Sequence, residues 1–512
     1  KPLTLVVLIS HFLKDIFKFH PAQSSSRTHY LRIALLRNVS NNERKGKYTM
    51  QITVLDYLSR SVAQNPDKIA YVDEKRGMTF SQLQQEAFHN AMPLVRMGIR
   101  HRPVAVFLDK SVECIAGFLG VIASGNYYTP LDTQMPMPRI LRIMNTLHPA
   151  AVLTDQKHET MVKEFDGDAA VVLYEEAQTV ELDTRRLEEI SVQIVDTDVL
   201  YVLFTSGSTG NPKGVIISER AAVDFTEWGA EAFQIDDSWV FGNQTPFYFS
   251  MSVFDIYQTL RNGATMYIIP HTAFSFPVVL MKYLFEHKIN AIFWVPSALS
   301  MISALGALNC PHLPELRNVL FGGEVMPMKQ LNKWIAEYPN VRYVNMYGPT
   351  EVTDTCTAYV VNRSFEDTER LPMGLPCRNM DVFLLDEQNA LVTDQSIGEV
   401  CVRGTGLAYG YYHDPQKTAE SFVQNPLNQM YPEVIYRTGD LAQRNAFGEL
   451  VFVSRKDFQI KHMGHRIELG EIEAAISAVD GIDSNACLYD AKRQKIVAFY
   501  TGSVEKGNCS RH

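Results

Sequence analysis

Runs of apolar residues alternate with amphipathic stretches along most of the chain. Residues 104–108 and 150–153 are continuously apolar, which is typical of strands that are buried on both faces. Residues 83–97 repeat apolar positions at helical spacing, which predicts an amphipathic helix. Because strands and helices alternate, the pattern predicts an α/β fold with a largely parallel sheet that helices cover on both faces.

The pattern changes after about residue 380. Residues 381–385 and 398–404 are short strand-like runs with frequent glycine, which predicts a β-rich subdomain. We therefore expect a large N-terminal domain at 50–456, made of two α/β sheet subdomains and this β-rich subdomain. A small C-terminal α+β domain is expected at 457–512.

The first 49 residues differ in charge from the rest. They contain nine Lys or Arg and two Asp or Glu, which is a net charge of +7. The whole chain has a net charge of −9, so the residues after position 49 have a net charge of −16. One hypothesis is that Met50 is the true start and that residues 1–49 are a leader translated from upstream DNA. The alternative is a targeting peptide, because residues 3–9 are apolar and arginines stand among serines, but no small-residue cleavage pattern follows.

Composition excludes several classes of protein. Hydrophobic residues make up 46% and charged residues 21% of the chain, as in soluble globular proteins. A net charge of −9 argues against nucleic-acid binding. The seven cysteines are odd in number and show no C-x-x-C spacing, so we expect neither a disulfide framework nor a zinc site, and a cytoplasmic location. No apolar run reaches about 18 residues, so no membrane span is expected.

The strongest motif is a glycine-rich loop between two predicted strands. Residues 199–204 lead into Thr-Ser-Gly-Ser-Thr-Gly-Asn-Pro-Lys-Gly at 205–214, and a second apolar run follows at 215–217. Three glycines let backbone N–H groups curve around an anion, four hydroxyls can donate to phosphate oxygens, and Lys213 adds positive charge. The loop therefore predicts a phosphate site. It departs from a Walker A motif because Pro212 replaces the second glycine and Gly214 replaces the Ser/Thr.

This decapeptide resembles the phosphate-binding signature of the acyl-adenylate-forming (AMP-binding) superfamily. Further motifs occur in the order of that family, two before the decapeptide and five after it, and the resemblance extends over roughly residues 50–500. It is closest to D-alanine carrier-protein ligases and nonribosomal-peptide adenylation domains. The motifs lie at 78–83, 125–132, 322–327, 345–351, 436–441, 457–461 and 466–473.

The resemblance implies an ATP-dependent ligase. A small carboxylic or amino acid would react with ATP and Mg²⁺ to give acyl-AMP and pyrophosphate, and the acyl group would pass to a phosphopantetheinyl carrier protein. Two alternatives remain. One is an acyl-CoA synthetase, which differs in its thiol acceptor. The other is a catalytically impaired nucleotide-binding remnant, because the C-terminal lysine motif of the family has no counterpart after Tyr500.

The family's nucleotide-binding residues can be assigned position by position. Asn345 and Tyr347 would hold the adenine, whereas Asp440 and Arg455 would contact the ribose. Lys213, Thr350 and Glu351 would be catalytic, with Glu351 as the Mg²⁺ ligand. The positions that the resemblance assigns to the nucleotide are Thr205, Ser206, Gly207, Ser208, Thr209, Gly210, Gly323, Glu324, Asn345, Met346, Tyr347, Gly348, Pro349, Thr350, Asp440 and Arg455.

The inferred acyl pocket departs from the family in its charge. Ser250 stands where amino-acid-activating members have the aspartate that binds the α-ammonium, and Gly322 stands where D-alanine ligases have a cysteine, which argues against D-alanine. Asp354 lies at a position that is usually apolar. We therefore hypothesise that Asp354 binds an amine placed away from the α-carbon; a structural role at a local turn is the alternative. The pocket positions are Ser250, Met251, Phe254, Phe293, Leu320, Gly322, Met346, Asp354 and Thr355.

The start of the small domain resembles the family's pivot. Asp457 stands at the hinge position about which that domain turns between the adenylating and the thioester-forming arrangements. The family continues beyond this region to a lysine that contacts ATP and the carboxylate. Since no such motif follows residue 500, we expect the small domain to be truncated and the chain to bind ATP but adenylate slowly.

Overall fold

A computed structural model describes residues 53–502, apart from residues 166, 207–210, 457–458, 463–464, 478, 480 and 491–494. Contacts divide the chain between Gln51 and Ile52, and the described residues all follow this division. The leader expected at 1–49, the hinge Asp457 and the end of the chain after 502 lie outside the described residues.

The largest sheet among the described residues has nine strands. Six of them, β1, β10, β9, β11, β12 and β13, run parallel, and the outer strands β2, β14 and β15 pair antiparallel. Their order is β15 (Leu375–Pro376), β14 (Thr357–Val360), β13 (Arg342–Tyr347), β12 (Asn318–Gly322), β11 (Ala291–Trp294), β9 (Val240–Asn243), β10 (Thr265–Ile268), β1 (Ile69–Val72) and β2 (Gly77–Thr79).

A second sheet of six strands holds the predicted phosphate loop. The apolar runs at 104–108 and 150–153 form its strands β3 and β5, as predicted, and only β8 runs antiparallel to its neighbour. The loop at 205–214 joins β7 to β8. The strand order is β6 (Ala170–Leu173), β5 (Ala151–Thr154), β3 (Pro103–Phe107), β4 (Tyr127–Leu131), β7 (Val199–Thr205) and β8 (Lys213–Ser218).

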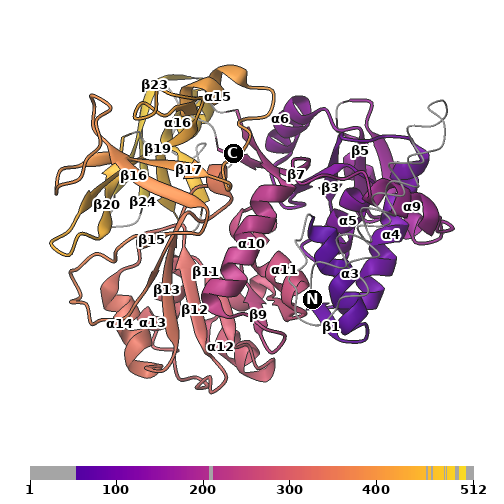
Figure 1. Cartoon of the computed structure of the whole chain (residues 1–512), viewed down its shortest axis with the longest axis horizontal. Helices are drawn as coiled ribbons and strands as arrows, with labels where there is room; N and C mark the ends of the chain where they lie inside the picture. Colours follow the sequence, from indigo (N-terminus) through magenta and orange to yellow (C-terminus); the bar gives the residue numbers. More distant parts are fainter. Residues whose placement is uncertain are drawn as a thin grey trace, which may run out of the picture. The chain divides into compact units, whose positions relative to one another are not determined.

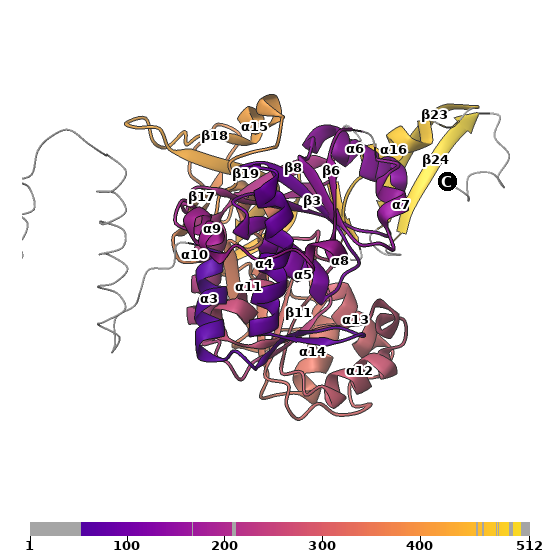
Figure 2. The same ribbon diagram turned by 90° about the vertical axis from the view of Figure 1, so that its right-hand side faces the viewer.

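Helices form a layer between the two sheets. In the main apolar core, buried side chains of this layer pack together with side chains of both sheets. Figures 1 and 2 show these helices beside the strands of the two sheets. The helix expected at 83–97 begins three residues earlier, because Thr79 Oγ1 accepts from Gln82 N–H and the Gln82 side chain accepts from Thr79 N–H. The layer contains α3 (Val54–Gln64), α4 (Phe80–Arg96), α5 (Val112–Ala123), α10 (Glu219–Phe233) and α11 (Met251–Asn262).

Other helices cover the outer faces of the sheets. On the nine-stranded sheet, η1 (His271–Ser275), α12 (Pro277–Glu286), α13 (Pro296–Ala304) and α14 (Met328–Glu337) enclose a second apolar cluster. On the six-stranded sheet, α6 (Met137–Leu147) and α7 (Glu159–Val162) enclose a third. Both main sheets are thus covered on two faces, as the sequence predicts. The short helices α8 (Tyr174–Ala177) and α9 (Thr184–Ser191) contact α4 and α5 respectively.

The β-rich region predicted after residue 380 is a five-stranded antiparallel sheet. It contains β16 (Met380–Leu385), β17 (Gly398–Gly404), β19 (Val434–Arg444), β18 (Phe422–Gln424) and β20 (Leu450–Arg455), with α15 (Pro415–Ser421) before β18. After it come the hairpin of β21 (Gln459–His462) and β22 (His465–Glu468), α16 (Leu469–Ser477), and the hairpin of β23 (Ile482–Asp490) and β24 (Lys495–Gly502). Among the described residues, no helix is long and apolar enough to cross a bilayer.

Candidate active site

The predicted acyl pocket lies where parallel strands of the nine-stranded sheet end. Phe293 on β11 pairs with Leu320 on β12, and Gly322 at the end of β12 pairs with Met346 on β13. Because the carboxyl ends of parallel strands meet at one edge of a sheet, residues from separate motifs come together here. Phe293, Leu320 and Met346, the apolar residues predicted for the pocket on these strands, are all buried.

The first turn of α11 supplies another wall of this pocket. Ser250 is the residue before the helix, and Met251 and Phe254 follow on its first turns. The Phe254 and Phe293 rings pack edge to face with centroids 5.5 Å apart. A Cβ built on Gly323 would lie 3.5 Å from the Met251 sulfur, so the helix and the end of β12 are in contact.

Steric crowding explains the glycine at position 322. A Cβ at this position would lie 2.5 Å from the carbonyl oxygen of Met346 on the neighbouring strand. A backbone oxygen cannot move away without disturbing the β12–β13 pairing, so a larger residue such as cysteine does not fit this backbone. The departure from the D-alanine ligase pattern therefore has a local structural cause.

Asp354 places a carboxylate against this apolar pocket. Asp354 is only 5% exposed. Its Oδ1 accepts a hydrogen bond from Ser250 Oγ over 2.9 Å, and its Oδ2 accepts one from Thr355 Oγ1 over 3.1 Å. Thr353 and Asp354 both have positive φ, 59° and 75°, which side-chain-bearing residues rarely adopt. With this backbone conformation, the Asp354 side chain contacts Ser250 at the start of α11.

A serine joins the pocket to the predicted phosphate threonine. Ser250 Oγ lies 3.3 Å from Thr350 Oγ1 and also donates to Asp354. Thr350 begins η2 (Thr350–Val352), directly after Gly348 and Pro349. A Cβ on Gly348 would lie 2.3 Å from the Asp354 carbonyl oxygen, so glycine permits this close return of the chain.

The residues predicted for adenine and ribose meet around one carboxylate. Tyr347, at the end of β13, donates its hydroxyl to Asp440 Oδ2 over 2.6 Å, and Arg455 Nη1 donates to Asp440 Oδ1 over 2.7 Å. Asp440 and Arg455 are paired neighbours on β19 and β20. Burial, followed by the negative charge of Asp440, raises the pKa of Tyr347 well above its usual value, so its hydroxyl stays protonated.

Two further predicted residues have structural partners. The Asn345 side chain donates to the carbonyl oxygen of Pro372 over 2.8 Å. Glu324 Oε2 accepts from the backbone N–H of Ser297 in the first turn of α13, over 2.9 Å. A carboxylate at a helix N-terminus is favourable, so Glu324 anchors the loop after β12 whatever else it contacts.

Lys213, the lysine predicted to bind phosphate, is the first residue of β8. Its ammonium lies 4.0 Å from Glu468 Oε1 and 5.3 Å from the centre of the Tyr411 ring, and its side chain is 12% exposed. Thr205 Oγ1 donates to the Lys213 carbonyl oxygen over 3.4 Å, and Ser206 is buried. Residues 207–210 of the predicted loop lie outside the described residues.

Tyr411 is a site residue that the sequence did not reveal. Its hydroxyl donates to Glu351 Oε1 over 2.9 Å, and Glu351 is fully buried. The segment that contains Tyr411 lies beside β8 because the two pair. Tyr412 N–H donates to the Gly214 carbonyl oxygen over 2.7 Å, and Tyr411 forms an antiparallel β-bridge with Val215. The neighbouring glycine and tyrosines are no specific signal, so only the topology could have placed this hydroxyl.

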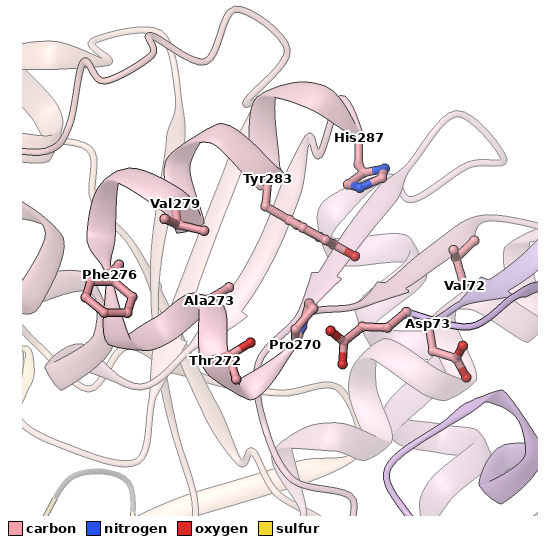
Figure 3. Close-up of a pocket in the computed structure, with 10 residues that line it drawn as sticks. Val72, Asp73, Pro270, Thr272, Ala273, Phe276, Val279, Tyr283 and His287 are labelled. Atoms are coloured by element: carbon pink, nitrogen blue, oxygen red, sulfur yellow. The ribbon is translucent and has the colours of Figure 1, made fainter.

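A separate cavity of about 570 Å³ lies on another part of the nine-stranded sheet. It is lined by Val72, Asp73, Phe276, Tyr283 and His287, among others. Figure 3 shows Tyr283 and His287 projecting from the end of α12 toward the segment that contains Val72 and Asp73. None of the residues predicted to bind the nucleotide or the acid lines this cavity, so the cavity is distinct from the candidate site.

Known proteins with similar sequences identify the family. Residues 58–412 match the model of the family described as AMP-binding enzyme. Tyrocidine synthase 1 of Brevibacillus parabrevis is 31% identical over 418 residues, which are 81% of this chain and 37% of that protein. Zwittermicin A synthase ZmaJ of Bacillus cereus is 31% identical over 463 residues, 88% of this chain and 86% of that protein. The chain spans only 7% of tyrocidine synthase 3 of Brevibacillus parabrevis, to which it is 32% identical over 445 residues.

Solved structures agree with this family in fold. Holo-PA1221, described as an NRPS protein with adenylation and PCP domains, superposes with a TM-score of 0.78 at 24% identity, covering 88% of this chain and 76% of that one. IdnL1 superposes with a TM-score of 0.75 at 25% identity, covering 90% and 93%. With the family model matching more than half of its residues, the chain belongs to the AMP-binding enzyme family.

Proposed function

We propose that the chain activates a small carboxylic or amino acid with ATP and transfers it to the thiol of a phosphopantetheinyl carrier protein. The observation on which this rests is the contact of Ser250 with both Thr350 and Asp354. These contacts support the proposal because Thr350 is the residue expected at the α-phosphate, and Ser250 and Asp354 are residues expected in the acyl pocket. A carboxylate in that pocket would therefore face the α-phosphorus of a nucleotide bound along Tyr347 and Asp440.

In the first step, a carboxylate oxygen of the acid attacks the α-phosphorus, the bond to the bridging oxygen breaks, and pyrophosphate leaves. Lys213 supplies positive charge to the phosphates, and Thr350 donates a hydrogen bond to the α-phosphate. Tyr347 and Asn345 orient the adenine, while Asp440 accepts from the ribose hydroxyls and Arg455 holds Asp440 in place. In the second step, the sulfur of the carrier thiol bonds to the acyl carbon, the bond from that carbon to the oxygen bridging it to phosphorus breaks, AMP leaves with this oxygen, and the thiol proton is released.

Glu351 suits the role of a Mg²⁺ ligand. Its carboxylate is an oxygen donor of the kind that Mg²⁺ prefers, and it lies close to Thr350 in sequence and to Lys213 through Tyr411. When bound, Mg²⁺ would supply charge that neutralises the phosphates. Tyr411 would orient the carboxylate by its hydrogen bond.

The carrier protein is proposed from two lines of support. The segment 457–473 resembles carrier-loading adenylation domains, and PA1221 is described as containing adenylation and PCP domains. The chemistry of activation is the same in an acyl-CoA synthetase, so the acceptor has to be tested directly.

Pyrophosphate exchange into ATP tests the activation step. A panel of α-amino, β-amino, aryl and fatty acids should include at least one acid that supports exchange, and Lys213→Met should reduce that exchange about 10²–10³-fold. The activated acid is then offered free coenzyme A and a phosphopantetheinylated carrier in parallel. Thioester on the carrier alone supports the proposal; thioester on coenzyme A favours the synthetase. ATP binding without exchange for any acid would favour a nucleotide-binding remnant.

A further inference from the structure

A lysine from the six-stranded sheet reaches the loop that leads into the acyl pocket. Lys110 follows β3, and its ammonium donates to the carbonyl oxygen of Gln244 over 3.0 Å and lies 3.5 Å from that of Asn243. The ammonium also lies 5.5 Å from the centre of the Phe247 ring. All three contacts are with the segment 243–250, which runs from the last residue of β9 to the residue before α11.

The same segment also contacts a buried carboxylate on α11. Asp255 is 1% exposed, follows the pocket residue Phe254, and accepts from Asn243 Nδ2 over 2.8 Å through Oδ2. Its Oδ1 has no hydrogen-bond partner within the part of the chain that the structure describes. The same holds for side-chain oxygens of the three residues at the start of the segment, Asn243, Gln244 and Thr245.

A buried carboxylate beside several buried acceptors is costly unless positive charge lies nearby. Burial raises the pKa of Asp255 to about 7; the hydrogen bond from Asn243 and the charge of Lys110 lower it, and the charge of Asp354 raises it further. Burial lowers the pKa of Lys110 to about 7, although Asp255 and Asp132 both oppose this change. The Lys110 ammonium is therefore largely removed from water at this position.

We propose that Lys110 is a positioning residue for the acyl pocket: by holding the carbonyl groups of 243 and 244 and balancing Asp255, it fixes the pocket wall formed by Ser250, Met251 and Phe254. This inference rests on the proposed function, because that function defines the pocket. The wall lies at the start of α11, whereas the lysine follows β3 of the six-stranded sheet. A change at Lys110 should therefore affect the acid and leave the nucleotide end unchanged.

Two measurements test the proposal on the full chain. Hydrogen–deuterium exchange of peptides covering 244–252 should become at least five-fold faster in Lys110→Met, whereas peptides covering 436–444 should not change. In pyrophosphate exchange with the best acid of the panel, Lys110→Met should raise the KM for the acid at least ten-fold and change the KM for ATP less than two-fold. Lys110→Arg, which keeps the charge, should fall between the wild type and Lys110→Met in both measurements.

Lys157→Met is the matched control. Lys157 is an exposed lysine that pairs with Asp109, the neighbour of Lys110, over 2.6 Å. It should leave both measurements unchanged. If Lys110→Met does not fold, Lys110→Met/Asp255→Asn removes both buried charges and should show the same faster exchange at 244–252.

The outcomes separate this inference from the proposed function. Unchanged hydrogen exchange at 244–252, or equal increases in the KM of acid and ATP, would overturn the role of Lys110. If the wild type activates no acid, the proposed function fails, whereas hydrogen exchange still decides whether Lys110 positions the loop.

Discussion

The hydroxyl of Tyr347 and the carboxylate of Asp440 form a 2.6 Å hydrogen bond that joins the nine-stranded sheet to the five-stranded sheet. Arg455 contacts the other oxygen of the same carboxylate. One buried carboxylate therefore orders the residue predicted to hold adenine and the residue predicted to contact ribose.

Replacing this carboxylate should cost both stability and nucleotide affinity. Asp440→Asn removes the negative charge that faces Arg455, whose side chain is only 11% exposed. Breaking a buried pair in this way typically costs about 3–5 kcal/mol. We expect a lower Tm and weaker ATP binding by titration calorimetry. Asp440→Asn/Arg455→Met should recover part of the Tm but not the affinity; recovery of both would show that Asp440 has no part in binding the nucleotide.

Tyr411 should affect catalysis through Glu351, the proposed Mg²⁺ ligand, because its hydroxyl donates to that carboxylate. Tyr411→Phe removes the hydrogen bond to Glu351 and leaves the aromatic ring near Lys213. We expect the pyrophosphate exchange rate to fall about ten-fold, which corresponds to the loss of about 1.4 kcal/mol, and the Mg²⁺ concentration for half-maximal rate to rise.

The neighbouring tyrosine provides the control for this prediction. Tyr412 contacts the hydroxyl of Tyr127 over 3.1 Å, away from Glu351, so Tyr412→Phe should retain both the rate and the Mg²⁺ dependence. Equal effects of the two substitutions would mean that the Tyr411 hydroxyl acts only through folding.

The sequence predicts the alternating architecture because buried strands and amphipathic helices leave direct patterns, as at 104–108 and 83–97. Thr350 and Asp440 could be proposed as site residues because they occur in recognisable motifs, and Ser250 because it departs from the family pattern; their roles stay predictions. Tyr411 and Lys110 could not be predicted in this way, for one physical reason. Each acts through a contact between segments that are far apart in the chain, Tyr411 through pairing with β8 and Lys110 through the loop after β9.

Glu219 should make folding stability depend on pH. Burial raises its pKa from 4.5 to about 8, although Val54 N–H donates to its carboxylate over 3.0 Å. Between these two values the folded chain retains a proton that the unfolded chain has lost. The contribution of Glu219 to the free energy of unfolding is therefore full below pH 4.5. It falls by about 1.4 kcal/mol per pH unit as the pH rises from 4.5 to about 8.

Urea unfolding at pH 5.5, 6.5 and 7.5 tests this dependence. Glu219→Gln keeps an acceptor for Val54 and should flatten the fall, so that it is more stable than the wild type at pH 7.5. Glu188→Gln, at an exposed glutamate, should follow the wild-type curve. Parallel curves for the wild type and Glu219→Gln would contradict the predicted protonation.

Asp354 provides the most specific prediction about the substrate. Its carboxylate is buried, and the hydroxyl of Ser250 contacts both this carboxylate and the hydroxyl of Thr350. If the substrate binds with its own carboxylate at Thr350, an amine on the β-carbon or further along the side chain would meet Asp354. An α-amine would instead lie toward Ser250, which offers no charge.

Asp354→Asn should therefore discriminate between acids rather than weaken all of them. For an acid with a β- or side-chain amine, we expect kcat/KM in pyrophosphate exchange to fall at least 10²-fold, because an ammonium buried without its counter-charge costs several kcal/mol. An amine-free acid of similar size should be activated equally well or better, because the variant no longer buries a carboxylate beside an apolar group. Thr355→Val serves as the control, since it removes the 3.1 Å hydrogen bond to Asp354 and keeps the charge. Equal losses for aminated and amine-free acids, or a wild-type preference for α-amino acids, would assign Asp354 to the local turn at Thr353.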